Sequence, residues 1–149
     1  MNARTVARRP TPAEDLDVER LAEALARITR GTRRQLALPI GASSLSVLAT
    51  VASRGPLRLG DLARLEGITP ATLSRVVTAL EEGGYAERTV DAVDRRSSWL
   101  TVTPAGSDLL TGVRRERAAL LAARAERLTA AERTALSAAL DAFEALAAD

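Results

Sequence analysis

Hydroxyl side chains and one arginine share one face of a helix that we predict over residues 69–82. This face comprises Thr69, Ala71, Thr72, Ser74, Arg75 and Thr78. Small residues and hydroxyls let a helix enter the major groove of DNA, where an arginine can donate two hydrogen bonds to guanine O6 and N7. Acidic residues are absent until Glu81 and Glu82, at the far end of the helix. A surface helix of small residues without a ligand is the alternative interpretation.

The opposite face of this helix is apolar. Leu73, Val76, Val77 and Leu80 follow one another at the spacing i, i+3, i+4 and i+7, which places them on one side. We expect this side to pack on a core, so that the polar side faces outward.

Two short strands with a basic tip follow the helix, after a turn at Gly83 and Gly84. Residues 85–90 and 97–103 are rich in β-branched side chains and alternate in polarity, which predicts an antiparallel hairpin. Adjacent arginines at a hairpin tip suit the minor groove of DNA, where narrow A·T-rich segments have an enhanced negative potential. A solvated charged loop is the alternative, because loop tips are commonly polar.

The hairpin tip supplies the second group of predicted DNA contacts, and these are Arg95, Arg96 and Ser97. Asp94 is interpreted as an intrachain partner that holds Arg96 in position. We expect Ala86, Leu100 and Val102 to face inward.

From about Leu36 to the C-terminus, these residues resemble the MarR family of winged helix-turn-helix transcription regulators. The resemblance is strongest over residues 74–110. The family's wing pattern, Asp-Arg-Arg and then Leu-Thr-x-x-Gly, appears as residues 94–96 and 102–106, with Val102 where leucine is usual. The resemblance implies that Arg75 lies on the face toward the major groove and that Arg96 enters the minor groove.

One departure from the family pattern lies at the start of the preceding helix. The family usually has a threonine there, whereas this chain has Arg58, which cannot accept the backbone N–H bonds of a helix cap. Two alternatives remain open: Arg58 contacts a DNA phosphate, or the cap is left to water.

Helix-start signals divide the chain into six predicted helices and one hairpin. Threonines that can cap a first helical turn stand at Thr11, Thr69, Thr103 and Thr129, and the first and last complete capping boxes. Another helix is expected to start at Ser43 or Ser44. That helix is expected to bury Leu45, Leu48, Ala49 and Ala52. A single further helix is expected to follow Thr129.

The predicted fold is mainly α with a small β wing, a winged helix-turn-helix module flanked by terminal helices. We expect one domain with these parts: a flexible arm at residues 1–11, the DNA-binding module at about residues 40–103, and dimerisation helices at about residues 12–38 and 104–148.

The terminal helices predict a homodimer. Their apolar stripes and alanine-rich faces need a partner to cover them, and a second copy of the chain is the simplest one. The resemblance implies the same, because the family dimerises through these helices. Two recognition helices would then read an inverted-repeat operator with half-sites about one helical turn apart. Packing of the termini on each other within one chain is the alternative.

A small aromatic or anionic effector is implied by the resemblance, bound between the dimerisation helices and the DNA module. Arg33 and Arg34 are the candidate pocket residues. With one Trp, one Tyr and one Phe, the chain offers little stacking surface, and we expect Trp99 to serve packing. An Arg-Arg pair at a helix end also fits a solvated face or a helix-dipole partner.

Composition narrows the function. The 149 residues contain no Cys and no His, which removes thiol chemistry and the commonest zinc sites. We therefore expect no enzyme, catalytic residue, metal or cofactor. The N-terminus lacks a signal peptide and the chain lacks an apolar run of membrane-spanning length, so we expect a cytoplasmic protein without a membrane partner.

The net charge of +2 is small for a DNA-binding protein. All 21 cationic side chains are arginine, and their excess lies in residues 1–34, including Arg4, Arg8 and Arg9 of the N-terminal arm. Specific binding must therefore depend on a few well-placed arginines. The alternative function is a winged-helix module that binds proteins rather than DNA, because a fold alone does not determine function.

Overall fold

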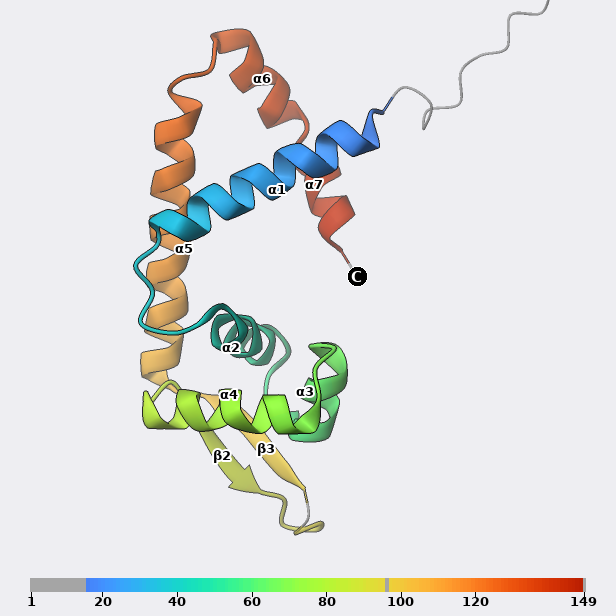
Figure 1. Cartoon of the computed structure of the whole chain (residues 1–149), viewed down its shortest axis with the longest axis vertical. Coiled ribbons are helices and arrows are strands. Elements are labelled where there is room, and N and C mark those ends of the chain that lie inside the picture. Colours follow the sequence, from blue (N-terminus) through green and yellow to red (C-terminus); the bar gives the residue numbers. More distant parts are fainter. Residues whose placement is uncertain (1–15, 96, 149) are drawn as a thin grey trace, which may run out of the picture. The chain divides into compact units, whose positions relative to one another are not determined.

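The computed structural model describes residues 16–95 and 97–148 (Figure 1). Within this part of the chain, seven helices and three short strands occur in the order α1 (Val18–Gln35), α2 (Ala42–Arg54), β1 (Leu57–Arg58), α3 (Leu59–Leu65), α4 (Pro70–Glu82), β2 (Ala86–Val90), β3 (Ser98–Val102), α5 (Pro104–Ala125), α6 (Ala130–Ala138) and α7 (Leu140–Ala147). The predicted fold, mainly helical with a small antiparallel wing, is confirmed. No helix among the described residues is both long enough and apolar enough to cross a membrane.

The chain divides into two compact units, with α1 in the first and every later element in the second, which begins at Leu36. Helix α1 ends before the predicted bound at Leu38, and residues 12–15 of the predicted segment lie outside the described residues. It starts at Val18, where Asp17 Oδ1 accepts the backbone N–H of Arg20 at 3.0 Å. It ends at Gln35, three residues before Leu38, where Pro39 would disfavour helical geometry. The predicted cap at Thr11 lies outside the described residues.

Helix α2 starts one residue before the predicted Ser43. Gly41 is its N-cap, with an extended backbone and no side-chain cap bond. The predicted apolar face was partly wrong: Leu48 is buried, but Ala49 and Ala52 are exposed. Val47 and Val51 are buried in their place because α2 also contacts α4 and β3.

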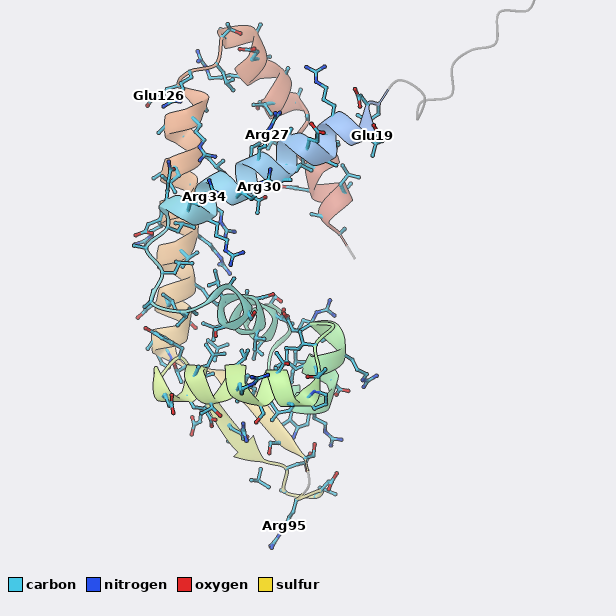
Figure 2. All side chains as sticks on the ribbon, in the orientation of Figure 1. Glu19, Arg27, Arg30, Arg34, Arg95 and Glu126 are labelled. Carbon is cyan, nitrogen blue, oxygen red and sulfur yellow. The ribbon has the colours of Figure 1, made fainter. Side chains whose placement is uncertain are left out.

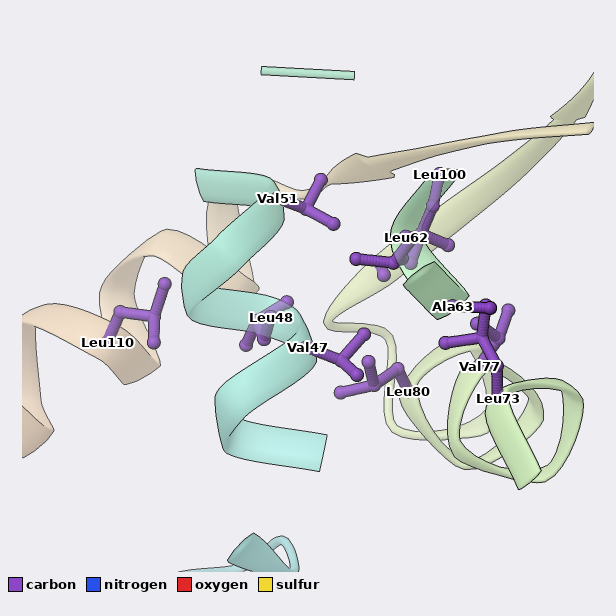
Figure 3. Close-up of a cluster of buried hydrophobic side chains, with 11 residues drawn as sticks. Val47, Leu48, Val51, Leu62, Ala63, Leu73, Val77, Leu80, Leu100 and Leu110 are labelled. Carbon is purple, nitrogen blue, oxygen red and sulfur yellow. The ribbon is translucent and has the colours of Figure 1, made fainter. Parts of the chain in front are cut away.

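The core of the second unit joins α2, α3, α4, the sheet and the start of α5 (Figure 3). Its buried side chains are Val47, Leu48, Val51, Leu62, Ala63, Leu73, Val77, Leu80, Ala86, Leu100 and Leu110. The apolar face predicted for α4 is confirmed, with Val76 half-buried at its edge. Burying an aliphatic side chain contributes roughly 1.5–3 kcal/mol, so this face holds α4 with its polar side outward.

The sheet has three antiparallel strands in the order β1-β3-β2, one more than predicted. In the hairpin, Ala86 pairs with Val102 and Arg88 with Leu100, so the predicted inward side chains Ala86 and Leu100 are buried. Strand β1 contains only two residues and pairs Arg58 with Trp99. Two residues cannot show an alternating pattern, which is why the sequence did not predict this strand.

The start of α5 is tied closely to the base of the hairpin. Thr103 caps α5 by accepting the N–H of Gly106 at 3.1 Å, and its hydroxyl donates to the Gly84 carbonyl at 2.7 Å. Its backbone N–H donates to the Tyr85 carbonyl at 3.1 Å. A Cβ added at Gly106 would lie 2.1 Å from that same Tyr85 oxygen, so only glycine permits this approach.

The single helix predicted after Thr129 is wrong: two helices, α6 and α7, meet at Ala139. The capping box at Thr129 is confirmed, because its hydroxyl accepts the Glu132 N–H at 3.2 Å and Glu132 accepts the Thr129 N–H at 2.8 Å. Neither helix buries a residue within the chain.

Candidate nucleic-acid interface

The outer face of α4 presents most of the polar residues that the sequence predicted there. Ala71, Ser74, Arg75 and Thr78 are exposed, and Thr72 is half-buried. The Thr78 hydroxyl donates to the Ser74 carbonyl at 3.0 Å, so it is held against the helix. Arg75 therefore stands on an exposed face whose other side chains are short.

The N-terminus of α4 is capped by Thr69. Its hydroxyl oxygen accepts the Thr72 N–H at 3.2 Å and lies 3.0 Å from the Thr72 hydroxyl, while Pro70 occupies the first helical turn. Proline lacks a backbone N–H, which would have no partner within the helix at this position, and its fixed φ angle suits the first helical turn. The cap orients both threonine hydroxyls at the end of the helix where backbone N–H groups also point outward.

The wing tip carries Arg95 on its exposed surface, and its side chain points away from the hairpin (Figure 2). The tip is closed by two backbone hydrogen bonds: Asp91 N–H donates to the Ser97 carbonyl at 3.0 Å, and Ser97 N–H donates to the Asp94 carbonyl at 2.8 Å. Ser97 is half-buried. Arg96 lies outside the described residues, so its predicted pairing with Asp94 stays a prediction.

Asp91 holds the wing together, a role that the sequence analysis did not foresee. Its side chain is only 7 % exposed. Asp91 Oδ1 accepts the backbone N–H of Val93 at 2.8 Å and of Asp94 at 3.2 Å. Oδ2 accepts from Trp99 Nε1 at 2.9 Å and from Arg58 Nη2 at 2.8 Å. One carboxylate thus joins the tip of the wing to its base.

These hydrogen bonds lower the pKa of Asp91 from 3.8 to about 2. The backbone N–H groups of Val93 and Asp94 contribute most, followed by the Trp99 indole; burial opposes them, and the nearby Arg58 charge adds a smaller effect. Each of these donors stabilises the ionised carboxylate. Asp91 is therefore charged throughout the neutral range.

Arg58 is directed to the wing in this structure. It stands at the N-cap position of α3 without a side-chain cap bond, as its chemistry predicted. Its guanidinium pairs with Asp91, lies 5.1 Å from the centre of the Trp99 ring, and keeps 45 % of its side chain exposed. The stacking is a cation–π contact. Trp99 is half-buried, and its indole N–H also donates to Asp91. Contact between Arg58 and a phosphate stays a prediction.

A second ion pair connects the wing to the far end of α4. Arg88 Nη2 in β2 lies 3.7 Å from Glu81 Oε2, and both side chains are about one-third exposed. A pair this long and this accessible contributes little energy. It nevertheless places Glu81, the first acidic residue of α4, beside the hairpin rather than on the predicted DNA-contacting face.

On α1, the predicted effector residues Arg33 and Arg34 line an open surface pocket of about 300 Å³ together with Arg30. Figure 2 labels Arg30 and Arg34 on this helix. The spacing i, i+3 and i+4 places these three side chains on one face of the helix. Arg30 was not among the predicted pocket residues, although its helical spacing to Arg33 and Arg34 is evident in the sequence. Three guanidinium groups at one pocket suit an anion.

Comparisons with known proteins point to one family. Residues 40–98 match the family model described as MarR family. Over 127 residues, which cover 85% of this chain and 89% of the relative, the sequence is 34% identical to an HTH-type transcriptional regulator of Mycobacterium tuberculosis. A transcriptional regulator from Thermotoga maritima has a similar structure, with a TM-score of 0.71 and 25% identity over 86% of this chain and 91% of that one.

One similar structure belongs to a regulator whose DNA binding is controlled by a small molecule. Bordetella bronchiseptica BpsR, whose DNA binding is regulated by 6-hydroxynicotinic acid, matches with a TM-score of 0.57 and 22% identity over 84% of this chain and 98% of that one. At this identity the likeness shows the fold alone.

Proposed function

Because the chain belongs to the MarR family and is a DNA-binding transcriptional regulator, we propose that it is a sequence-specific repressor that binds an inverted-repeat operator as a homodimer. Helix α4 reads base edges in the major groove, and the wing tip enters the adjacent minor groove. The observation that carries this proposal is the exposed Arg75 on a face of α4 that otherwise presents short side chains. The protein acts in the cytoplasm, where its DNA lies.

The predicted contacts have distinct roles in this proposal. Arg75 binds a guanine, and the side chains around it make hydrogen bonds or close contacts with neighbouring bases and phosphates. These neighbours are Thr69, Ala71, Thr72, Ser74 and Thr78. Arg95, Arg96 and Ser97 contact the minor groove and its phosphates, with Asp94 as an orienting group.

A homodimer is supported by the exposed apolar residues of the C-terminal helices. Leu136, Leu140 and Leu146 are between 47% and 66% exposed, and α6 and α7 bury no residue within the chain. A second copy that covers these side chains would also supply the second α4 that an inverted repeat requires.

An anionic effector is supported by the pocket of Arg30, Arg33 and Arg34. The aromatic acid that regulates BpsR belongs to the same chemical class. Since the chain has few aromatic residues, recognition here depends on the carboxylate rather than on ring stacking.

The proposal is tested by selecting the purified protein against a random duplex library at moderate salt, with Arg75→Ala and Arg75→Lys in parallel. We expect the parent to retain an inverted repeat. Both variants should lose discrimination at the contacted base pair, by about 1–3 kcal/mol for a bidentate arginine–guanine contact.

The lysine variant separates the two possible roles of Arg75. Lysine keeps the charge but not the planar pair of donors. A phosphate contact would therefore survive this change, whereas a guanine contact would be weakened. A folded parent that enriches no motif would contradict sequence-specific binding and favour the protein-interaction alternative.

A further inference from the structure

We propose that Arg58, Asp91 and Trp99 form a wing clamp that sets the position of the wing tip, and hence of Arg95, for contact with DNA. This inference rests on the proposed function and adds positioning residues to it. None of the three was predicted to have this role. The clamp joins residues from three segments: the end of β1, the loop after β2, and the beginning of β3.

The geometry of the Asp91 carboxylate carries the inference. Its two oxygens serve different parts of the wing: Oδ1 accepts the backbone N–H groups of Val93 and Asp94, and Oδ2 accepts the side-chain donors of Arg58 and Trp99. Rotation of the tip therefore cannot occur without loss of hydrogen bonds to a nearly buried charge. Such losses are costly, which favours one orientation of the tip.

The pairing of β1 with β3 brings the other two members together. Arg58 and Trp99 are register partners, and the guanidinium lies over the indole ring. Strand β1 leads directly into α3, the helix before α4. Through Arg58, the clamp therefore attaches the wing to the start of α3. The position of the tip is thereby linked to that of the recognition helix.

The charge of Asp91 by itself would weaken DNA binding, whereas a positioning role of Asp91 would strengthen it. A carboxylate beside a DNA-contacting loop repels phosphates, and pairing with Asp91 neutralises the Arg58 charge. If Asp91 acted only through its charge, its removal would strengthen DNA binding. If Asp91 positions the wing, its removal weakens specific binding, so the two roles predict changes of opposite sign.

The test compares Asp91→Asn with Glu87→Gln on the duplex selected by the parent and on an unrelated duplex. Both variants remove one negative charge, but Glu87 is exposed on β2 and does not belong to the clamp. Asparagine cannot present two acceptor oxygens to the donors around Asp91. We expect Asp91→Asn to weaken binding to the selected duplex by about tenfold, the effect of roughly one good contact, without weakening binding to the unrelated duplex. Glu87→Gln should leave unchanged the ratio of the affinities for the selected and the unrelated duplex.

A double-mutant cycle with Arg58→Gln separates the clamp from a direct phosphate contact by Arg58. Within a clamp, the effects of Arg58→Gln and Asp91→Asn on specific binding overlap, so the double variant resembles either single one. A direct phosphate contact would instead add its effect to that of Asp91→Asn and lower the salt slope of binding by about one. Additive effects would overturn the clamp.

The fluorescence of Trp99, the only tryptophan of the chain, reports on the clamp in the protein without DNA. Asp91→Asn should shift its emission and Glu87→Gln should not. If Asp91→Asn does not fold, as judged by circular dichroism, Trp99→Phe keeps an aromatic ring but removes the indole donor. This variant should reduce specificity in the same direction.

Two failures are distinguishable. A parent that selects no duplex overturns the proposed function and the clamp's role in DNA binding together. A parent that selects a duplex, with variants that bind it as well as the parent does, overturns the clamp alone.

Discussion

At the scale of single residues, the wing illustrates how position outweighs charge. Asp91 and Asp94 are three residues apart in the same polar loop, yet only Asp91 is buried and holds four donors. Arg58 gains a partner 33 residues away and leaves the α3 cap without a side-chain bond. With a net charge of only +2, the molecule depends on such placement for its interaction with DNA.

The contribution of Asp91 to stability should depend on pH. Its pKa is lowered from 3.8 to about 2 in the folded protein, so the contribution is complete above the ordinary pKa and is lost as the pH falls through the lowered one. We expect the stability difference between the parent and Asp91→Asn to be constant above about pH 5 and to shrink as the pH falls from about 4 toward 2. Urea unfolding of both proteins across this range measures the difference, and a constant value down to pH 3 would contradict the assignment.

At the scale of elements, the junction of the hairpin with α5 is the most constrained connection. Thr103 caps the helix and bonds to Gly84 and Tyr85, while Gly106 passes against the Tyr85 carbonyl. These contacts fix the direction in which α5 leaves the sheet. A displacement of the start of α5 would therefore also displace the base of the hairpin, to which it is bonded.

Gly106→Ala should destabilise the protein. The added Cβ would lie 2.1 Å from a backbone oxygen, which cannot move as a flexible side chain can. We expect a loss of about 1–3 kcal/mol, typical of overpacking, measured by thermal or urea unfolding.

Gly112→Ala is the matched control on the same helix. Among the described residues, no atom lies within 4 Å of a Cβ at Gly112, so alanine should stabilise α5 by about 0.5–1 kcal/mol through helix propensity. Equal effects of the two substitutions would show that the Tyr85 contact does not restrict position 106.

At the scale of the whole molecule, α6 and α7 expose the large apolar side chains Leu136, Leu140 and Leu146. A partner that covers exposed apolar surface gains free energy from its burial. The proposed dimer covers these side chains and brings two copies of α4 onto one operator.

Leu140→Glu should weaken the dimer. Leu140 is 55% exposed, and a glutamate there would bury a charge in the proposed interface. Ala145→Glu is the control, because at about 100° per residue position 145 lies on another side of α7. Sedimentation equilibrium should show a higher dissociation constant for Leu140→Glu than for the parent and for Ala145→Glu. An unchanged dimer in Leu140→Glu would locate the interface elsewhere.

Much of the fold could be predicted from the sequence because its signals are local. The apolar periodicity of α4 and the threonine caps at Thr69, Thr103 and Thr129 act over a few residues, and the structure confirms them. The alternating pattern likewise predicted the hairpin. The same local signals placed Arg75 on the exposed side of the recognition helix.

Only the tertiary structure decided the contacts between distant segments. The two-residue strand β1, the partner of Arg58 and the choice of Asp91 over Asp94 as the central carboxylate depend on which strands lie side by side. Side-chain periodicity reports which face of an element is buried, but it does not report what covers that face. The recognition helix was therefore visible in the sequence, whereas the clamp that positions the wing beside it became visible only when the chain was folded.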